Sequence, residues 1–184
     1  MGRDLKDEFR PLGFDNISIH SPRVGRDHNG LKQFDVVKLA KQNPEIMPPL
    51  PYRSTAKSAG YDVFAPFTIT LQPNEEAKIP TFIKAYMNDG EVLKAYPRSG
   101  LGFKYYCRLA NTVGIIDSDY ADNEANEGHI FIKLRNEGDE PMTINKGEAM
   151  CQFIFEKFLL VAGDSFNKGN KRIGGFGSTT SQKD

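Results

Sequence analysis

The sequence predicts an all-β fold, and three observations support this class. Short runs rich in Val, Ile, Phe and Tyr recur from Phe34 onward, and many of them alternate apolar with polar residues. Turn sequences with Asn, Asp, Gly and Pro separate these runs at short intervals. No stretch beyond residue 50 shows a long helical period with caps. Many short strands at this spacing are typical of a β barrel or sandwich.

The order of elements follows from the same patterns. Residues 1–32 are polar, carry several prolines and glycines and show no period, so we interpret them as an appendage. FDVVKLA at 34–40 is expected as a strand, and the proline-rich 44–51 stretch as an extended linker. The β runs expected next are YDVFA, FTITL, AKIPTFIKAYM, EVLKAY, YYCRLA, VGII, HIFIKL, MTI and MCQFIFEKFLLV. The turn 88–90 predicts a hairpin, and 102–106 could form a short helical turn.

Composition and charge narrow the class of function. The chain has 24 basic and 24 acidic residues, so its net charge gives no general attraction to nucleic acid or to an anionic membrane. No apolar run approaches the roughly 20 residues of a membrane span, and the N-terminus lacks the apolar core of a signal peptide. We therefore expect a cytoplasmic protein. Cys107 and Cys151 form no disulfide or zinc pattern and are expected to be reduced, buried thiols.

Three stretches combine residue types suited to an anion, a metal or water. In 58-SAGYDVFAP-66, Asp62 opens an apolar strand and could face a metal or its water shell. The turn 97-PRSGLG-102 joins a guanidinium, a hydroxyl and glycine amides, which is a combination that binds phosphate. In 111-NTVGIIDSDY-120, Asp117 could orient water and Tyr120 could stack on a ligand. An extended backbone would point Asp117 and Asp119 to opposite faces.

Two further stretches lie toward the C-terminus. In 147-GEAMCQF-153, Gln152 occupies a strand between apolar residues, where its amide needs a partner. The tail 172-RIGGFGSTT-180 combines an arginine, a phenylalanine, glycines and hydroxyls. Taken one at a time, all five stretches are also compatible with turn aspartates, a surface turn, a structural glutamine and a frayed tail. Their order and joint spacing carry the interpretation.

In this order, the five stretches resemble the five motifs of the homotrimeric dUTP diphosphatases (dUTPases) over roughly residues 34–180. AGYD, PRSGLG, NTVGIIDSDY, GxxxxQ and RxGGFGST follow the family patterns, and NEGHIFIKL resembles phage and Gram-positive members. The resemblance implies a jelly-roll-like, distorted β barrel that forms a homotrimer. It places the barrel at residues 33–163, an extension of unknown role at 1–32, and a mobile C-terminal arm at 164–184 that closes a neighbouring subunit's site.

The resemblance also implies an activity, which is hydrolysis of dUTP to dUMP and diphosphate by attack of water on the α-phosphorus. This reaction limits uracil incorporation into DNA and supplies dUMP for dTTP synthesis. Asp117 would orient the water, and Asp62 would hold Mg²⁺ through water. The residues implied to bind the substrate are Arg98, Ser99, Gly100, Asn111, Gly114, Ile115, Ile116, Tyr120, Phe131, Gln152, Arg172, Phe176, Gly177, Ser178 and Thr179.

The roles follow from the positions that match the family. Asn111 and the backbone of 114–116 match the uracil-binding hairpin, which the strand near Phe131 would complete. Tyr120 would stack under the deoxyribose and leave no room for a 2′-hydroxyl. Arg172 would hold the terminal phosphate.

Other phosphate contacts are implied in the same way. The turn 98–100 matches the phosphate-binding turn, and Gln152 matches an α-phosphate contact. Phe176 would cover the pyrimidine, and the hydroxyls of 178–179 would reach the γ-phosphate.

The sequence departs from the family pattern at three places. Ala149 stands where the fourth motif usually has arginine, and Thr180 where the fifth usually ends in glycine. The segment 121-ADNEANEG-128 is longer than the usual tight turn. A second hypothesis is therefore a nucleotide-gated interaction protein that binds a regulatory partner through 1–32 or 121–128. A third and weaker reading is deamination of dCTP on the same fold, against which the fifth motif and the uracil hairpin argue.

Overall fold

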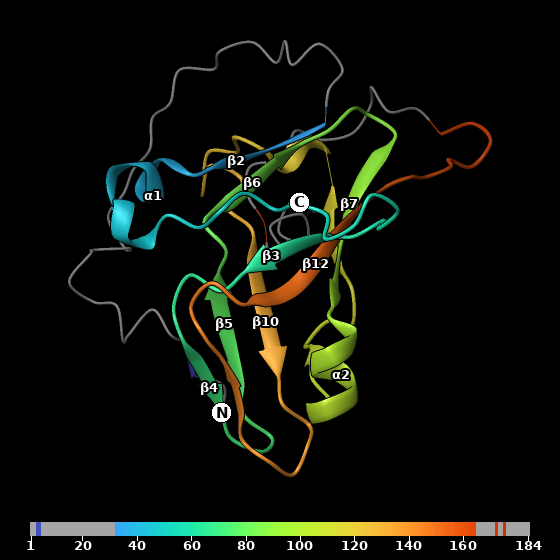
Figure 1. Ribbon diagram of the computed structural model, residues 1–184. Helices are drawn as coiled ribbons and strands as arrows, with labels where there is room; N and C mark the ends of the chain where they lie inside the picture. The colour runs from blue at the N-terminus through green and yellow to red at the C-terminus, as the bar shows by residue number, and fades with distance from the viewer. Residues whose placement is uncertain (1–2, 5–31, 165–171, 173–174, 176–184) are drawn as a thin grey trace, which may run out of the picture.

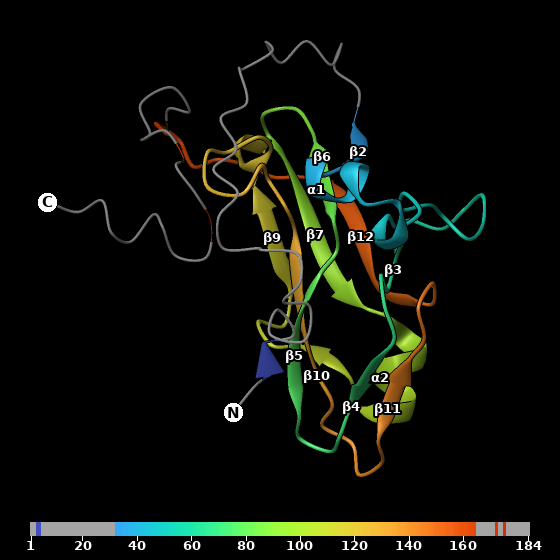
Figure 2. The same cartoon turned by 90° about the vertical axis from the view of Figure 1, so that its left-hand side faces the viewer.

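Two four-stranded sheets face each other and contain most of the strand residues (Figures 1 and 2). The computed structural model describes residues 3–4, 32–164, 172 and 175. The first sheet has the order β1-β5-β10-β8 and the second β3-β12-β7-β9, and two-stranded sheets β11-β4 and β2-β6 complete the structure. The all-β class predicted from the sequence is confirmed.

The elements have the following bounds. The strands are β1 Arg3–Asp4, β2 Gln33–Val36, β3 Tyr61–Phe64, β4 Ile69–Leu71, β5 Glu76–Pro80, β6 Ile83–Tyr86, β7 Glu91–Pro97, β8 Arg108–Leu109, β9 Gly114–Asp117, β10 Phe131–Arg135, β11 Met142–Ile144 and β12 Ala149–Lys157. The helical segments are α1 Lys38–Gln42, η1 Pro44–Ile46, α2 Ser99–Tyr105 and η2 Ser118–Tyr120. In the described part of the chain, none of these is long and apolar enough to cross a membrane.

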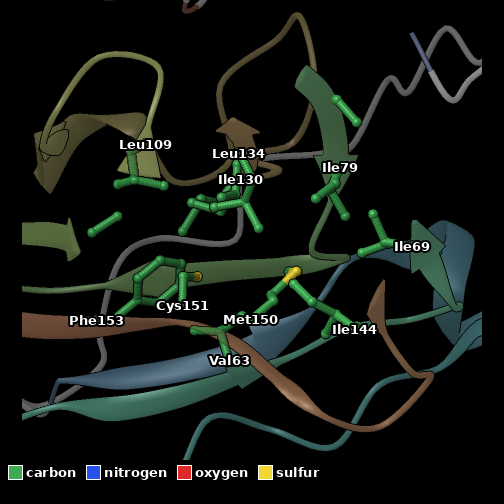
Figure 3. Packing of buried hydrophobic residues seen from close by; sticks show 14 of the residues in the cluster. Val63, Ile69, Ile79, Leu109, Ile130, Leu134, Ile144, Met150, Cys151 and Phe153 are labelled. Atoms are coloured by element: carbon green, nitrogen blue, oxygen red, sulfur yellow. The ribbon is translucent and has the colours of Figure 1, made fainter. Parts of the chain in front are cut away.

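The core lies between the two large sheets. Side chains alternate along each strand, so in β10 Ile132 and Leu134 are buried whereas Lys133 is exposed. Figure 3 shows Leu134 on one side of this core and Phe153 on the other. The apolar runs thus mark most strands, although AKIPTFIKAYM forms the two strands β5 and β6, YYCRLA contains only β8, and the last run ends at Lys157.

The predicted hairpin at 88–90 is wrong as a pairing. A turn is present, because Gly90 has φ +79° and the Glu91 N–H donates to the Asn88 carbonyl at 3.2 Å. The strands on either side nevertheless pair elsewhere, β6 with β2 and β7 with both β12 and β9. The β7–β12 register runs without a break from Cys151↔Pro97 to Lys157↔Glu91. This long ladder decides the partner of β7, whereas the turn only reverses the chain.

Two further expectations change in detail. The run expected as one strand at 34–40 is β2 followed by α1, since Lys, Leu, Ala and Gln favour helix. The linker at 44–51 begins with η1, whose proline lies at the first helical position. The short helix expected at 102–106 begins earlier, at Ser99, and ends before Tyr106, which has φ +52°. The appendage contributes β1, which pairs with β5.

An ion cluster around the buried Lys84 connects β6 to the segment 121–128. The Lys84 ammonium lies 2.8 Å from a carboxylate oxygen of Asp122 and 2.8 Å from one of Glu127. The second oxygen of Glu127 accepts a hydrogen bond from the Lys38 amide at 3.1 Å. Burial would lower the pKa of Lys84, but hydrogen bonds to the two carboxylates outweigh it and raise that pKa. Lys84 therefore stays charged inside the protein.

We predict that Lys84→Met lowers the free energy of unfolding by about 3 kcal/mol, because it leaves Glu127 buried without its cation. Urea unfolding at fixed protein concentration measures this change. Lys94→Met is the matched control, since Lys94 and Glu156 form a pair that is about one third exposed, and such pairs contribute less than about 1 kcal/mol. Equal effects of the two substitutions would contradict the interpretation.

Both cysteines are free and buried, as the sequence predicts. Burial raises the pKa of Cys107 to about 11, and it also raises the pKa of Cys151. We predict that neither thiol reacts with an aromatic disulfide reagent at pH 8 in the native protein and that both react after unfolding. The thiolate absorbance released over time checks this, and rapid native modification of either thiol would contradict it.

Candidate active site

A cavity of about 250 Å³ lies beside β9 and β10. It is lined by residues from both sheets and from the C-terminal arm. Eight of them are residues for which the sequence implied a substrate or catalytic role, namely Asn111, Gly114, Ile115, Ile116, Asp117, Tyr120, Phe131 and Arg172. The structure therefore brings the implied base-binding residues of 111–131 together with Asp117 and with Arg172.

The wall of the cavity includes the backbone of β9. This strand pairs with β7 from Val92↔Asp117 to Ala95↔Gly114 and ends its sheet in the described part of the chain. All four residues of β9 line the cavity, although side chains in a strand alternate between faces. We infer that the edge of the strand that is not paired with β7 contributes main-chain groups to the wall. Gly114 keeps this edge close to β7, because a Cβ there would lie 3.0 Å from that of Ala95.

Strand β10 forms another part of the wall, but it does not pair with β9. It pairs with β5 and β8 instead, and Phe131 at its start lines the cavity. The strand near Phe131 is expected to complete the base pocket; Phe131 lines the cavity, from a strand that belongs to the other sheet and is not paired with β9. The space between these two strands is what the cavity occupies.

Tyr120 is buried at the base of the cavity, at the end of η2. Its hydroxyl donates to the His129 carbonyl at 2.9 Å and accepts from the Asn126 amide at 2.8 Å. Burial raises the pKa of Tyr120, although the Asn126 hydrogen bond acts in the opposite direction. Gly175 of the arm lies on the ring, because a Cβ there would be 2.8 Å from Tyr120 Cε2. A glycine is required for so close an approach.

Arg172 bridges two carboxylates at the rim of the cavity. Its Nη2 lies 2.5 Å from Asp117 Oδ2, and its Nε lies 2.7 Å from Asp119 Oδ1. The expectation that Asp117 and Asp119 face opposite sides is wrong, because the extended strand ends at Asp117 and η2 begins at Ser118. Because the backbone turns into η2 after Asp117, the two carboxylates lie on the same side, where Arg172 binds both. Asp119 is thus a site residue that the sequence interpretation did not single out.

The remaining implied residues gather in a second cluster outside this cavity. Asp62 on β3 lies opposite Gln152 on β12, and Arg98 Nε is 3.4 Å from Asp62 Oδ1. The Gln152 amide donates to the Pro97 carbonyl at 3.1 Å. The Ser54 hydroxyl also donates to Asp62. Ser99 and Gly100 belong to this cluster too, as the first residues of α2.

Within one chain the two clusters are far apart. Asp117 lies beside Val92, near the start of β7, whereas Arg98 follows the end of that strand. Six residues of extended chain between Val92 and Arg98 span roughly 20 Å, and Figure 2 shows α2 at the opposite end of β7 from the end of β9. Phe176, Gly177, Ser178 and Thr179 lie outside the described residues. Ala149 begins β12 beside an irregularity in its pairing with β3.

Comparisons with known proteins agree with this geometry. A family model described as dUTPase matches residues 48–180. A deoxyuridine 5′-triphosphate nucleotidohydrolase of Lactococcus lactis is 48% identical over 130 residues, which cover 71% of this chain and 87% of that protein. The protein of the same name from Hahella chejuensis is 37% identical over 155 residues, covering 81% of this chain and 98% of its own length.

Solved structures show the same relationship. The crystal structure of dUTPase from Streptococcus mutans has a TM-score of 0.61 and 37% identity, covering 71% of this chain and 98% of that one. A mutant dUTPase from phage phi11 of S. aureus, described with a structural Mg(II) ion, has a TM-score of 0.57 at 20% identity, covering 75% and 97%, and supports the fold alone. With the family match over most of its length and these relatives, the chain belongs to the dUTPase family.

Proposed function

We propose that the chain hydrolyses dUTP to dUMP and diphosphate. The observation that carries the proposal is the cavity in which a main-chain edge, a buried tyrosine and a carboxylate converge. The relatives named deoxyuridine 5′-triphosphate nucleotidohydrolases support the same substrate. The reaction limits uracil incorporation into DNA and supplies dUMP for dTTP synthesis, and we place it in the cytoplasm.

The edge of β9 recognises the uracil ring. Uracil presents one N–H donor between two carbonyl acceptors, and a strand edge presents N–H and C=O groups at fixed positions. Cytosine exposes an amino group where uracil has a carbonyl, so its donors and acceptors would meet the wrong partners. A site that hydrogen-bonds its ligand's own groups discriminates strongly against analogues that leave those groups unpaired. Phe131 and Ile116 close the apolar sides of the ring.

Asp117 orients the water that attacks the α-phosphorus. The new bond joins the water oxygen to this phosphorus, the bond from phosphorus to the bridging oxygen breaks, and diphosphate leaves with that oxygen. The Asp117 carboxylate accepts a hydrogen bond from the attacking water and favours loss of its proton. In the described structure Arg172 is paired with Asp117, so substrate phosphates must draw this guanidinium away before Asp117 can hold water.

The phosphates are bound by the second cluster of a neighbouring subunit. Within one chain roughly 20 Å of β7 separates Arg98 from Asp117, so the cluster of Arg98, Ser99, Gly100 and Gln152 lies far from the carboxylate that orients the water. Assembly into a homotrimer supplies them from another copy. Exposed apolar side chains offer surfaces for this assembly, including Phe103 at 90% and Leu159 at 96% exposure.

Magnesium fits this site as a ligand of the triphosphate. In the part of the chain that the structure describes, no three His, Cys, Asp or Glu residues gather to hold a metal ion. Mg²⁺ that is bound to phosphates keeps most of its waters and needs few protein ligands. Asp62 lies beside the phosphate-binding Arg98 and would hold the ion through water. The ion would supply neutralisation of phosphate charge.

The two other hypotheses gain no support. In the segment 121–128, Asn123 and Glu127 are buried and bond within the chain, whereas Asp122, Glu124 and Ala125 are exposed, so a partner at this segment stays a hypothesis. Most of residues 1–32 lie outside the described residues, so a partner there stays a hypothesis. The relatives carry the name of the dUTP hydrolases, which favours that activity over deamination of dCTP.

We predict that Asp117→Asn lowers kcat for dUTP by about 10²–10⁴-fold, because the amide cannot favour deprotonation of the attacking water. Affinity for a non-hydrolysable dUTP analogue should change far less, since most contacts to the nucleotide remain. Diphosphate release and calorimetry measure the two quantities. Asp139→Asn, an exposed carboxylate in a distant loop, should leave both unchanged. Full turnover in Asp117→Asn would remove this residue from its assigned role.

Subunit mixing tests whether one site uses two chains. We predict that Asp117→Asn and Arg98→Ala are each nearly inactive alone but regain activity when the two chains are refolded together. Random assortment leaves about a quarter of the sites with an intact Asp117 from one copy and an intact Arg98 from another. Diphosphate release from dUTP by the mixture checks this. A mixture no more active than its parents would contradict the shared site.

A further inference from the structure

We infer that Asn126 is a positioning residue that fixes Tyr120 and thereby sets the preference of the site for deoxyribose over ribose. The inference rests on the sugar-stacking role proposed for Tyr120. Asn126 lies in the segment 121–128, which is longer than the tight turn of commoner family members. Its contacts turn inward, toward the underside of the cavity, rather than toward solvent.

The proton arrangement around Asn126 follows from its backbone neighbours. The Gly128 amide points at the Asn126 side chain at 3.1 Å, and because an amide N–H can only donate, the atom it meets must be Oδ1. The other side-chain atom is therefore the NH₂ group. This group lies 2.8 Å from the Tyr120 hydroxyl and donates to it.

Asn123 fixes this orientation of the Asn126 side chain. Its Oδ1 accepts from the backbone amides of Ala125 at 3.0 Å and Asn126 at 3.1 Å, so its NH₂ group must point the other way. That group donates to Asn126 Oδ1 at 2.7 Å and to the Tyr120 carbonyl at 2.8 Å. Asn123 thus fixes both the side chain of Asn126 and the backbone of Tyr120.

The acceptor for the proton of the Tyr120 hydroxyl follows from this arrangement. Because it accepts from Asn126, its own proton must go to another acceptor, and the His129 carbonyl lies 2.9 Å away. Hydrogen bonds thus run in one direction from Asn123 through Asn126 and Tyr120 to His129. A ring held at its hydroxyl from two sides cannot tilt without breaking a bond in a buried environment.

The segment itself is anchored at both ends. Asp122 and Glu127 bind the buried Lys84 ammonium, each at 2.8 Å. Both residues have positive φ, 55° and 61°, a conformation that costs energy outside glycine. A Cβ on Gly128, which has φ +77°, would lie 2.7 Å from Ala121 Cα. The ion pairs to Lys84 and the hydrogen bonds of Asn123 and Asn126 hold this costly backbone in place, and the two asparagines connect it to Tyr120.

The position of the ring determines how much room the sugar has. Tyr120 lines the cavity between Asp117 and the arm's Gly175, which already lies against the ring. A 2′-hydroxyl needs additional space next to such a platform. Loosening the hydroxyl end of the ring therefore admits a ribonucleotide more readily, while Asp117 keeps its place at the end of β9.

The test compares dUTP and UTP as substrates of the full chain. Asn126→Asp keeps the shape of the side chain but removes the donor to Tyr120. We expect the ratio of kcat/KM for dUTP to that for UTP to fall about fivefold, as for loss of one buried hydrogen bond. The kcat for dUTP should change less than about twofold. Both substrates are measured on one sample, so a smaller folded fraction cancels from the ratio.

Two comparisons separate positioning from a general loss of structure. Ala125→Ser, an exposed position in the same segment, should leave the ratio unchanged. In a Tyr120→Phe background, Asn126→Asp should add less than about twofold to the change in the ratio, because the hydroxyl on which Asn126 acts is gone. An unchanged ratio in Asn126→Asp, or a full additional effect without the hydroxyl, would overturn the inference.

The wild-type protein distinguishes this inference from the function on which it rests. A wild-type chain that hydrolyses dUTP and rejects UTP, next to an Asn126→Asp variant with the same ratio, overturns the role of Asn126 alone. A wild-type chain that hydrolyses both nucleotides equally contradicts the sugar role of Tyr120, and the inference with it.

Discussion

The free edge of β9 is the constraint on which the rest of the site depends. Among the described residues β9 pairs with β7 alone, which leaves main-chain donors and acceptors along its other edge, and all four residues of β9 line the cavity. The same strand places Asp117 at its end, and the turn into η2 places Tyr120 beneath the cavity. In the proposed function this one short segment, held on β7, contacts the base, the sugar and the attacking water.

In the proposed function a homotrimer is needed, because the implied site residues form two separate clusters within one chain. One cluster surrounds the cavity with Asp117, and the other gathers Asp62, Arg98 and Gln152 at the far end of β7. An electrically neutral chain cannot attract a triphosphate by its overall charge, so local cations must do so. Arg172 is paired with Asp117 and Asp119 in one chain. It is therefore the cation best placed to leave these carboxylates and bind the phosphates of the substrate.

Much of this could be predicted from the sequence, because alternation of apolar residues determines strands and the motifs determine which side chains matter. Strand pairing was harder to predict from the sequence. The turn at Gly90 is a local signal, whereas β7 pairs with β12, which lies far along the chain. The common side of Asp117 and Asp119 depends on where β9 ends, which no residue pattern marks. Asn126 was not predicted at all, since an asparagine in a polar loop has no distinguishing signal until its neighbours' amides fix its orientation.

A crystal structure with a non-hydrolysable dUTP analogue tests the central claim most directly. We expect the uracil ring to hydrogen-bond to main-chain atoms of Gly114–Asp117 inside the cavity, with Arg98 and Gln152 of another copy on the phosphates. A base bound away from the edge of β9, or phosphates held by Arg98 of the same chain that binds the base, would contradict the claim.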